Sequence, residues 1–348
     1  DMRACRLAPD VVSHNAAISA CVKGARWHEA FEVMANLPQC CLEADVISYA
    51  AAISACEKGA LWHRALSLVS HARVRRMGAN VVVYNSAISA CEKGARWLEA
   101  LGVVADICSC NLTPTGITFN AAISACEKAA QWQAAFGVFS DMRKSRLVAD
   151  VTTCNAVISA CDKGARWQEA LTLFWNMRIC NLRADVITAS VAISACARGS
   201  RWQEALRIFF DVRMQRELVN TITYNAAMNA CAKGARWQNV FALLSSMSVC
   251  DLAPTAVTYN SAINAFEKGD RWQETLDLLS EMRLCQLEAD ETTCNIVIAA
   301  CSKASQTEHL KYMLSDMRLR RLEPHLTSSG LGAMEEGAYD VVWGRAAQ

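Results

Sequence analysis

The sequence is poor in the features that mark several classes of protein. Its 348 residues include only five prolines. No apolar run approaches the 18 residues that a membrane-spanning helix needs, so we expect no such helix. Apolar and polar residues do not alternate with a period of two, so strands are not expected. A formal net charge of +1 argues against a protein that binds polyanions through its overall charge. With 53% hydrophobic and 20% charged residues, the composition indicates a folded, soluble protein with an extensive core.

Metal-binding cysteine patterns are also missing, although the chain has 18 cysteines. No CxxC pair occurs, and Cys40-Cys41 and Cys108-Ser109-Cys110 have neither a companion pair nor histidines beside them. We therefore expect no metal and no cofactor. Instead, cysteines recur every 35 residues or a multiple of it, with Phe266 in the one vacant slot, as a packing position allows. These positions, expected to be buried free thiols in a reducing compartment, are Cys21, Cys56, Cys91, Cys126, Cys161, Cys196, Cys231 and Cys301.

A period of 35 residues governs the whole chain, without insertion or deletion from Val11 to His325. Residues 11–325 form nine tandem units, which begin at Val11, Val46, Val81, Gly116, Val151, Val186, Thr221, Ala256 and Glu291. Residues 1–10 match the end of a truncated repeat. Residues 326–348 resemble a degenerate repeat or C-terminal tail, either a cap or a frayed end. The first ten residues carry neither a signal-peptide core nor a transit pattern.

Each unit predicts two helices. In the unit from Val151, Thr153 is expected to be an N-cap and Gly164 to end the first helix. An apolar stripe with a period near 3.6 predicts the second helix; its members are Trp167, Ala170, Leu171, Phe174 and Met177. A hairpin of this size cannot bury its apolar face alone, so the units must stack. The predicted fold is all-α: one α-solenoid superhelix of stacked helix-turn-helix repeats, of either hand.

The first helix of each unit has two unlike faces. Residues such as Tyr84, Ile88 and Cys91 form a core face, and the opposite face carries an aliphatic residue, an amide, a small hydroxyl and a base in constant order. The aliphatic slot holds Val12, Ile47, Val82, Ile117, Thr152, Ile187, Ile222, Val257 and Thr292. The amide slot holds Asn15, Ala50, Asn85, Asn120, Asn155, Ser190, Asn225, Asn260 and Asn295. The basic slot holds Lys23, Lys58, Lys93, Lys128, Lys163, Arg198, Lys233, Lys268 and Lys303.

Stacked units would align these slots into three parallel ladders. A row of cations suits evenly spaced phosphates, aliphatic faces suit flat rings, and amides offer a donor and an acceptor to base edges. Single-stranded nucleic acid has that layout. Structural explanations compete with this one, because a lysine at a helix C-terminus favours the macrodipole and asparagine in a first turn can be a cap. The tryptophans that open each second helix lie on its apolar stripe, so we interpret them as inter-hairpin packing.

The unit VTTCNAVISACDKGARWQEALTLFWNMRICNLRAD, from Val151 to Asp185, resembles a pentatricopeptide repeat (PPR) of the P type. The resemblance covers about nine tenths of the chain, in period, phase and polar positions. It implies a single-stranded RNA-binding protein that reads one base per repeat, through the amide-slot residue and the last residue of the same unit. The aliphatic slot would sandwich bases, and the basic slot would face phosphates.

Transferred to this chain, the resemblance implies nine reading pairs. The combinations that favour uridine are Asn15 with Asp45, Asn120 with Asp150, Asn155 with Asp185, and Asn260 with Asp290. Ser190 with Asn220 resembles the combination that favours adenosine. No base is assigned to Ala50 with Asn80, Asn85 with Thr115, Asn225 with Thr255, and Asn295 with His325. The implied target is U-n-n-U-U-A-n-U-n, and the carboxylate either orients the amide or accepts directly from a base.

These patterns predict a sequence-selective RNA-binding adaptor without catalysis. The alternative is a helical-repeat scaffold that binds a peptide in its concave groove. Neither half of the deaminase signature found in some relatives, H-x-E and P-C-x-x-C, occurs, and no nucleophilic pair or acidic cluster repeats. The expected partners are single-stranded RNA and RNA-processing proteins, with no membrane and no small-molecule substrate. Family analogy implies a mitochondrion or chloroplast, and a role in RNA processing, stability or translation.

Overall fold

A computed structural model of the chain describes residues 10–37, 40, 42–75, 80–180, 182–214 and 219–319. These residues form α-helices without a strand, which confirms the predicted all-α fold. The expected partial repeat before Asp10, the reading residue His325 and the expected tail at 326–348 lie outside them. None of the helices in this part of the chain is long and apolar enough to cross a lipid bilayer.

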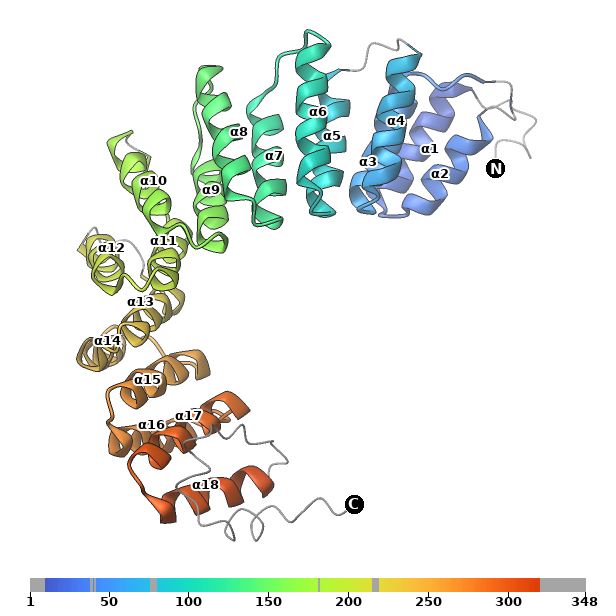
Figure 1. The fold of residues 1–348 in the computed structure, drawn as a ribbon. Helices are drawn as coiled ribbons and strands as arrows, with labels where there is room; N and C mark the ends of the chain where they lie inside the picture. The colour runs from blue at the N-terminus through green and yellow to red at the C-terminus, as the bar shows by residue number, and fades with distance from the viewer. Residues whose placement is uncertain are drawn as a thin grey trace. The chain divides into compact units, whose positions relative to one another are not determined.

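The helices alternate between first and second helices of successive repeats (Figure 1). The first helices are α1 (Val11–Lys23), α3 (Val46–Lys58), α5 (Val81–Lys93), α7 (Gly116–Lys128), α9 (Val151–Lys163), α11 (Val186–Arg198), α13 (Thr221–Lys233), α15 (Ala256–Lys268) and α17 (Glu291–Lys303). The second helices are α2 (Trp27–Asn36), α4 (Trp62–Val74), α6 (Trp97–Ser109), α8 (Trp132–Lys144), α10 (Trp167–Ile179), α12 (Trp202–Met214), α14 (Trp237–Val249), α16 (Trp272–Leu284) and α18 (Thr307–Leu319).

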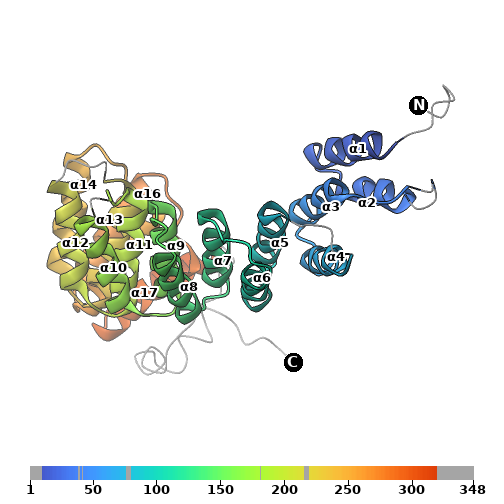
Figure 2. The same ribbon diagram turned by 90° about the horizontal axis from the view of Figure 1, so that it is seen from above.

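The chain divides into two compact units, residues 1–183 and 184–348. Within each unit, every odd-numbered helix packs against the next odd-numbered helix. Each even-numbered helix packs against the first helix of its own repeat. A contact with the first helix of the following repeat is also made by α2, α4, α6, α8, α12, α14 and α16. In the first unit this pattern gives two rows of helices, which are visible along the stack in Figure 2. Each unit is therefore a stack of helical hairpins in which the first helices form one continuous layer.

The first helix of each repeat starts two residues earlier than its predicted cap. In the fifth repeat the N-cap is Asp150, whose carboxylate accepts a hydrogen bond from the backbone N–H of Thr153. The prediction that Thr153 is itself the cap was wrong, because it lies at the third helical position. The last residue of one repeat is thus the cap of the next repeat's first helix, and that residue is also one of the predicted reading residues.

The predicted core face is confirmed. Tyr84, Ile88 and Cys91 are buried, and so are their counterparts in most other repeats. The cysteines in the described part of the chain are free thiols, and those of the 35-residue series are buried except for half-buried Cys21. Burial raises the pKa of the Cys56 thiol to about 12, which makes it a poor nucleophile at neutral pH. These cysteines therefore pack the hairpins together as small apolar side chains.

In several repeats the tryptophan that opens the second helix packs against the next repeat, as predicted. A Cβ atom added to Gly94 would lie 2.6 Å from Cδ1 of Trp62, and one added to Gly164 would lie 2.5 Å from Cδ1 of Trp132. The backbone of these glycines is not left-handed, since Gly94 has a φ of −85°, so glycine is needed here for space. The left-handed residue is the following one, with Ala95 at a φ of 52°.

An arginine also contacts the same indole ring. Cζ of Arg96 lies 4.5 Å from the ring centroid of Trp62, a cation–π contact between neighbouring repeats. The same contact joins Arg166 to Trp132, Arg236 to Trp202 and Arg271 to Trp237. In the fourth and ninth repeats, alanine replaces the glycine and glutamine replaces the arginine, at Ala129 with Gln131 and at Ala304 with Gln306. At these positions arginine thus occurs only together with glycine, whereas glycine can occur without arginine, as Gly59 does with Leu61.

We predict that Gly94→Ala lowers the free energy of unfolding by about 1–3 kcal/mol, because the new methyl group displaces the Trp62 ring. Gly102→Ala is the matched control, since a Cβ there meets nothing within 4 Å and alanine favours a helix interior by about 0.5–1 kcal/mol. Urea unfolding followed by circular dichroism measures both changes. Equal effects of the two substitutions would show that the ring does not require the glycine.

Candidate functional site

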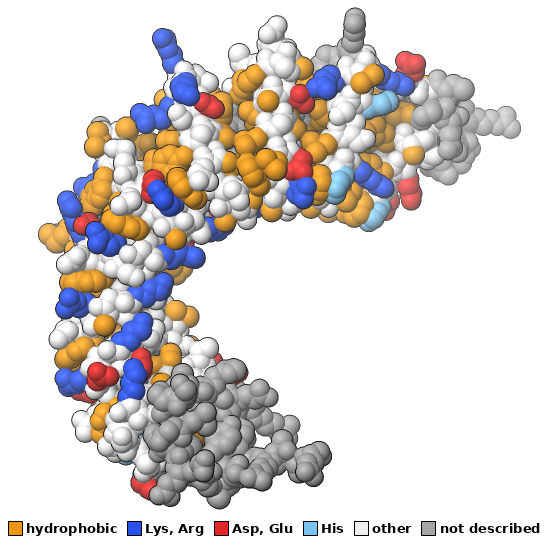
Figure 3. Space-filling model, in the orientation of Figure 1, with side chains coloured by type: hydrophobic (Ala, Val, Ile, Leu, Met, Phe, Trp, Pro, Cys, Tyr) orange, Lys and Arg blue, Asp and Glu red, His pale blue; other side chains and the backbone are white. Residues whose placement is uncertain are grey.

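The aliphatic slot is exposed in every repeat. Its valines and isoleucines keep between 59% and 72% of their surface accessible, from Val257 to Val12. Thr152 and Thr292, which hold the slot in two repeats, are also exposed. Isolated apolar side chains at a surface are ordinary, but here they recur at one position of each first helix. We call the surface that carries the aliphatic, amide and basic slots the ladder face. Figure 3 shows one side of the molecule, where apolar side chains and Lys or Arg share the surface of both units.

The amide slot lies at the junction between consecutive repeats. Nδ2 of Asn15 donates a hydrogen bond to Oδ1 of Asp45, at 3.0 Å. Oδ1 of Asn15 accepts from the hydroxyl of Ser48, the third residue of the next repeat, at 2.6 Å. The backbone N–H of Ser48 in turn donates to Oδ1 of Asp45, at 2.8 Å. Asp45 from the same repeat and Ser48 from the next one thus fix the orientation of the Asn15 amide.

The same arrangement recurs in both units. Oδ1 of Asn85 accepts from Thr118 at 2.6 Å, that of Asn120 from Thr153 at 2.5 Å, and that of Asn225 from Thr258 at 2.7 Å. Asn260 accepts in the same way from Thr293. The hydrogen bonds from Nδ2 are longer, at 3.5 Å to Thr115, 3.5 Å to Asp150, 3.4 Å to Thr255 and 3.3 Å to Asp290. The hydroxyl therefore sets the orientation of the amide more firmly than the last residue of the repeat does.

In Asp150 and Asp290 the two carboxylate oxygens have different partners, whereas in Asp45 a single oxygen, Oδ1, accepts from both the helix cap and Asn15. Oδ1 of Asp150 accepts from the backbone N–H of Thr153 at 2.7 Å and from the hydroxyl of Thr152, also at 2.7 Å. Oδ2 has only the long contact with Asn120 in the described part of the chain. Asp290 divides its oxygens in the same way, with Oδ1 on Thr292 and Thr293 and Oδ2 facing Asn260. Oδ1 is thus committed to the helix cap, whereas Oδ2 has acceptor capacity left.

Hydrogen bonds keep these carboxylates ionised. Burial acts to raise the pKa of Asp150, but hydrogen bonds from Thr153, Thr152 and Asn120 outweigh burial and hold the pKa below its ordinary value. The same causes lower the pKa of Asp290, where the donors are Thr293, Thr292 and Asn260. At neutral pH both carboxylates therefore accept hydrogen bonds and cannot donate them.

The pair that contains Ser190 differs from the others. Oγ of Ser190 donates to the backbone carbonyl of Val186 at 2.8 Å and lies 3.0 Å from the hydroxyl of Thr223. Oδ1 of Asn220 caps the next helix by accepting from the backbone N–H of Thr223, at 3.0 Å. Among the described residues, the cap uses only the oxygen of Asn220, so its Nδ2 group offers two N–H donors to the surface.

The other three predicted pairs are different cases. Ala50 has no amide, although its partner Asn80 caps α5 through the backbone N–H of Val83. Asn155 lies in the first unit and Asp185 in the second, where Asp185 caps α11. For Asn295, on α17, the predicted partner lies outside the described residues. These pairs remain predictions.

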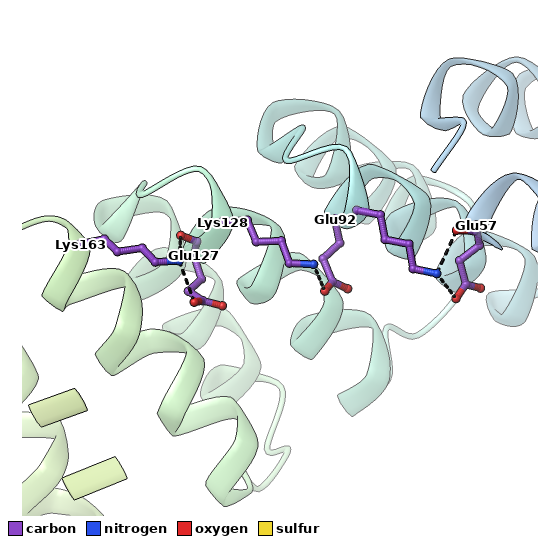
Figure 4. Close-up of polar contacts among 6 residues, drawn as sticks. Glu57, Glu92, Glu127, Lys128 and Lys163 are labelled. Carbon is purple, nitrogen blue, oxygen red and sulfur yellow. Dashed lines mark hydrogen bonds and ion pairs between the residues drawn. The ribbon is translucent and has the colours of Figure 1, made fainter. Parts of the chain in front are cut away.

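Acidic residues that the sequence analysis missed accompany the basic slot. Nζ of Lys128 lies 2.9 Å from Oε1 of Glu92, and Nζ of Lys163 lies 2.9 Å from Oε1 of Glu127 (Figure 4). Nζ of Lys93 donates to the backbone carbonyl of Glu57 at 2.9 Å and lies 3.5 Å from its carboxylate. Lys303 pairs with Glu267 at 2.5 Å. A constant separation of 36 residues between lysine and glutamate was the signal available in the sequence.

These ion pairs link the C-terminal ends of neighbouring first helices, where a cation also interacts favourably with the helix macrodipole. In these four repeats the lysines thus have a structural role as links between helices. Lys23, Lys58, Lys233 and Lys268 are exposed and make no ion pair within the described structure. The basic slot thus consists of two kinds of lysine, which the sequence analysis treated as one.

Clusters suited to a metal ion are not found among the described residues, where no three His, Cys, Asp or Glu side chains gather. The functional groups of the ladder face are therefore oriented amides, capping carboxylates and hydroxyls, exposed aliphatic side chains and lysines.

Models of pentatricopeptide repeats match more than half of the chain. The PPR repeat family matches residues 114–163, 219–268 and 254–303, the pentatricopeptide repeat domain matches 172–234, and the PPR repeat matches 292–322. No curated protein matches the chain.

Among solved structures, the chain resembles the pentatricopeptide repeat protein PPR10 from maize, with a TM-score of 0.70 and 14% identity over 99% of this chain and 53% of that one. The chain thus spans about half the length of PPR10. PPR10 in complex with an 18-nt psaJ RNA element gives a TM-score of 0.48, at 16% identity over 90% of this chain and 56% of the other. The PPR domain of Arabidopsis thaliana PRORP1 in complex with tRNA gives 0.44, at 16% identity over 50% and 91%. The first match shows a shared fold, and the other two are too weak to support an argument.

We predict that stability falls as pH drops below about 4, because the folded-state pKa values of Asp150 and Asp290 lie below those of the unfolded chain. Their contribution is present above the unfolded pKa and is lost as the pH falls through the folded one. Asp150→Asn with Asp290→Asn retains the caps, as Asn220 does, and should flatten this fall. Urea unfolding at pH 6 and pH 3 measures this change in the free energy of unfolding. Asp251→Asn, at a loop residue, is the control, and equal pH dependence in both variants would contradict the prediction.

Proposed function

Because the chain belongs to the pentatricopeptide repeat family, we propose that it binds single-stranded RNA and reads one base per repeat on the ladder face. The supporting observation is the junction of Asn, last residue and hydroxyl, which holds an amide in the same orientation in repeat after repeat, as with Asn120, Asp150 and Thr153. A scaffold that needed these residues only for helix capping would not also require the amide. PPR10, whose fold the chain shares, has itself been solved with an RNA element.

An aspartate at the reading position selects uridine over cytidine by donor and acceptor matching. Uridine presents an N–H donor at N3, whereas cytidine presents a lone pair there. Oδ2 of Asp150, which the helix cap does not use, accepts from the uridine N–H, and the second N–H of Asn120 donates to a uridine carbonyl. With cytidine, a carboxylate would face a lone pair. In this proposal one oxygen of the aspartate caps the helix and the other meets the base.

The repeat with Ser190 and Asn220 presents the opposite pattern. The oxygen of Asn220 is held by the helix cap, so the group that faces a base is a donor. Adenosine has an acceptor, N1, on its Watson–Crick edge. Uridine would instead place its N3–H donor against the N–H donor of Asn220. Adenosine is therefore the proposed base at this repeat.

The exposed aliphatic residues complete each base site. Val82 and Ile117, for example, occupy the second position of successive first helices and keep 64% and 68% of their surface accessible. A base that is placed between two such residues covers apolar area that the fold leaves in water, worth about 25 cal/mol per Å². This contribution is independent of sequence, so the amide slot and the last residue supply the selectivity.

We place the protein, by its family, in a mitochondrion or chloroplast. Its proposed role there is that of an adaptor without catalysis in RNA processing, stability or translation. Recruited partners would set the outcome for the bound transcript.

The exchange of one reading pair tests this function. We predict that wild-type protein binds U-C-C-U-U-A-C-U-C about tenfold more tightly than the same RNA with U at position six, equivalent to about 1.4 kcal/mol. Ser190→Asn with Asn220→Asp should reverse that preference, because the new carboxylate accepts from the uridine N3–H. Fluorescence anisotropy with labelled RNA measures both affinities.

Position eight serves as the control, because a change of U to C there affects the untouched pair of Asn260 and Asp290 and should weaken both proteins equally. An unchanged preference at position six would reject the assigned pairs. If the wild-type protein showed no salt-dependent affinity for any of these RNAs, RNA binding itself would be rejected in favour of the peptide scaffold.

A further inference from the structure

The residue before the basic slot varies among repeats and controls the charge of the ladder face. This twelfth position of the repeat, here called the acid slot, holds Val22, Glu57, Glu92, Glu127, Asp162, Ala197, Ala232, Glu267 and Ser302. In four cases the structure shows a glutamate of this slot paired with the lysine of the following repeat. An alanine in the slot removes the partner of the next lysine.

Paired lysines attract a phosphate weakly. In the pair of Lys128 and Glu92 the ammonium and carboxylate lie 2.9 Å apart (Figure 4), so a phosphate that approaches the ammonium also meets a negative charge well within the Debye length of about 8 Å. Ser159 adds to one such pair, because its hydroxyl donates to Glu127 at 2.8 Å. The lysines of these repeats are therefore occupied in joining helices.

The seventh and eighth repeats differ at two positions together. Ala197 precedes Lys233 by 36 residues, and Ala232 precedes Lys268 by the same interval, so neither lysine has an acid-slot partner. Both repeats also carry asparagine at their ninth position, as Asn229 and Asn264. The other repeats have serine or alanine there, at Ser19, Ser54, Ser89, Ser124, Ser159, Ser194 and Ala299. The loss of the acid thus coincides with the gain of an amide.

Each asparagine lies one helical turn before its lysine, a spacing that puts both side chains on the same helix face. Asn229 and Lys233 are exposed on α13, Lys268 is exposed on α15, and Asn264 is half-buried there. The helices α13 and α15 pack against each other within the second unit. Because the C-terminal end of a helix repels an anion, these side chains must supply the attraction. Glu267 directly precedes Lys268, but it pairs with Lys303, so neither Lys233 nor Lys268 is paired with an acid-slot residue.

We propose that Asn229 with Lys233, and Asn264 with Lys268, form a two-repeat binding site for the phosphate backbone of the RNA. This proposal rests on the proposed function and refines it. The amide N–H and the ammonium donate to phosphate oxygens of successive nucleotides, whereas the lysines paired with glutamate serve as links between repeats. Lys23 and Lys58 also lack an acid partner, but they have Ser19 and Ser54 instead of an amide.

The salt dependence of RNA affinity tests the proposal. Each phosphate contact on a single strand contributes roughly −0.7 to the slope of log K against log salt. Lys233→Gln with Lys268→Gln should therefore make the slope shallower by about 1.4. Lys93→Gln with Lys128→Gln is the matched control, in which two paired lysines are removed and the slope should stay nearly constant. Anisotropy titrations with labelled U-C-C-U-U-A-C-U-C between about 50 and 200 mM KCl measure the slopes.

Two more variants separate amide from charge. Asn229→Ser with Asn264→Ser should weaken binding several-fold without changing the slope, because an amide carries no charge. Glu92→Ala with Glu127→Ala, which reproduces the acid-slot alanines Ala197 and Ala232, should steepen the slope by up to about 1.4. Circular dichroism spectra identical to wild type are required of each variant, and Lys233→Ala with Lys268→Ala replaces Lys233→Gln with Lys268→Gln if that pair fails.

The outcomes distinguish the two proposals. If the protein binds RNA but the variants of Lys233 with Lys268 and of Lys93 with Lys128 make the salt slope equally shallow, the two-repeat site would be overturned. The proposed function would then remain intact. An unaltered affinity after Asn229→Ser with Asn264→Ser would also overturn it. Wild-type protein that does not bind the RNA at all would overturn the proposed function itself.

Discussion

The hydrogen bond from a backbone N–H to the last side chain of the preceding repeat is the interaction on which the remaining structure depends. It caps the first helix of each repeat, as Asp150 does for α9, and caps of this kind typically contribute about 1 kcal/mol. The same side chain faces the amide of its own repeat. In the proposed function, stacking and base reading are therefore coupled, because the residue that caps one helix also lies beside the amide that meets the base. Under that proposal, a substitution at this position must suit both a helix cap and a base.

Charge on the ladder face is largely neutralised inside the protein. Glu57, Glu92, Glu127 and Glu267 each occupy one lysine of the following repeat. Exposed ion pairs contribute little to stability, so their larger effect is on the field that an anion meets. A net charge of +1 is thus compatible with RNA binding, provided that base contacts and a few unpaired lysines supply the affinity. Selectivity benefits, because less of the binding energy comes from contacts that every RNA offers.

Much of the fold could be predicted from the sequence, because a 35-residue period fixes the phase of every hairpin at once. The buried cysteine series and the packing role of tryptophan followed from helical periodicity. The N-cap was misplaced by three residues, since Thr153 and Asp150 are both good caps and only the backbone geometry distinguishes them. The role of Gly94 was equally hidden, because spacing cannot show an indole ring from another repeat. The glutamate partners of the lysines lie 36 residues away and required the stack to bring them together.

Selection from a random RNA pool tests the central claim most directly. If the capping residue and the amide of each junction read one base, sequencing of the bound RNAs should show uridine at positions one, four, five and eight and adenosine at position six of a nine-nucleotide window. Those positions correspond to the repeats with Asn15, Asn120, Asn155, Asn260 and Ser190. Enrichment of a motif without that spacing, or of none, would contradict the account.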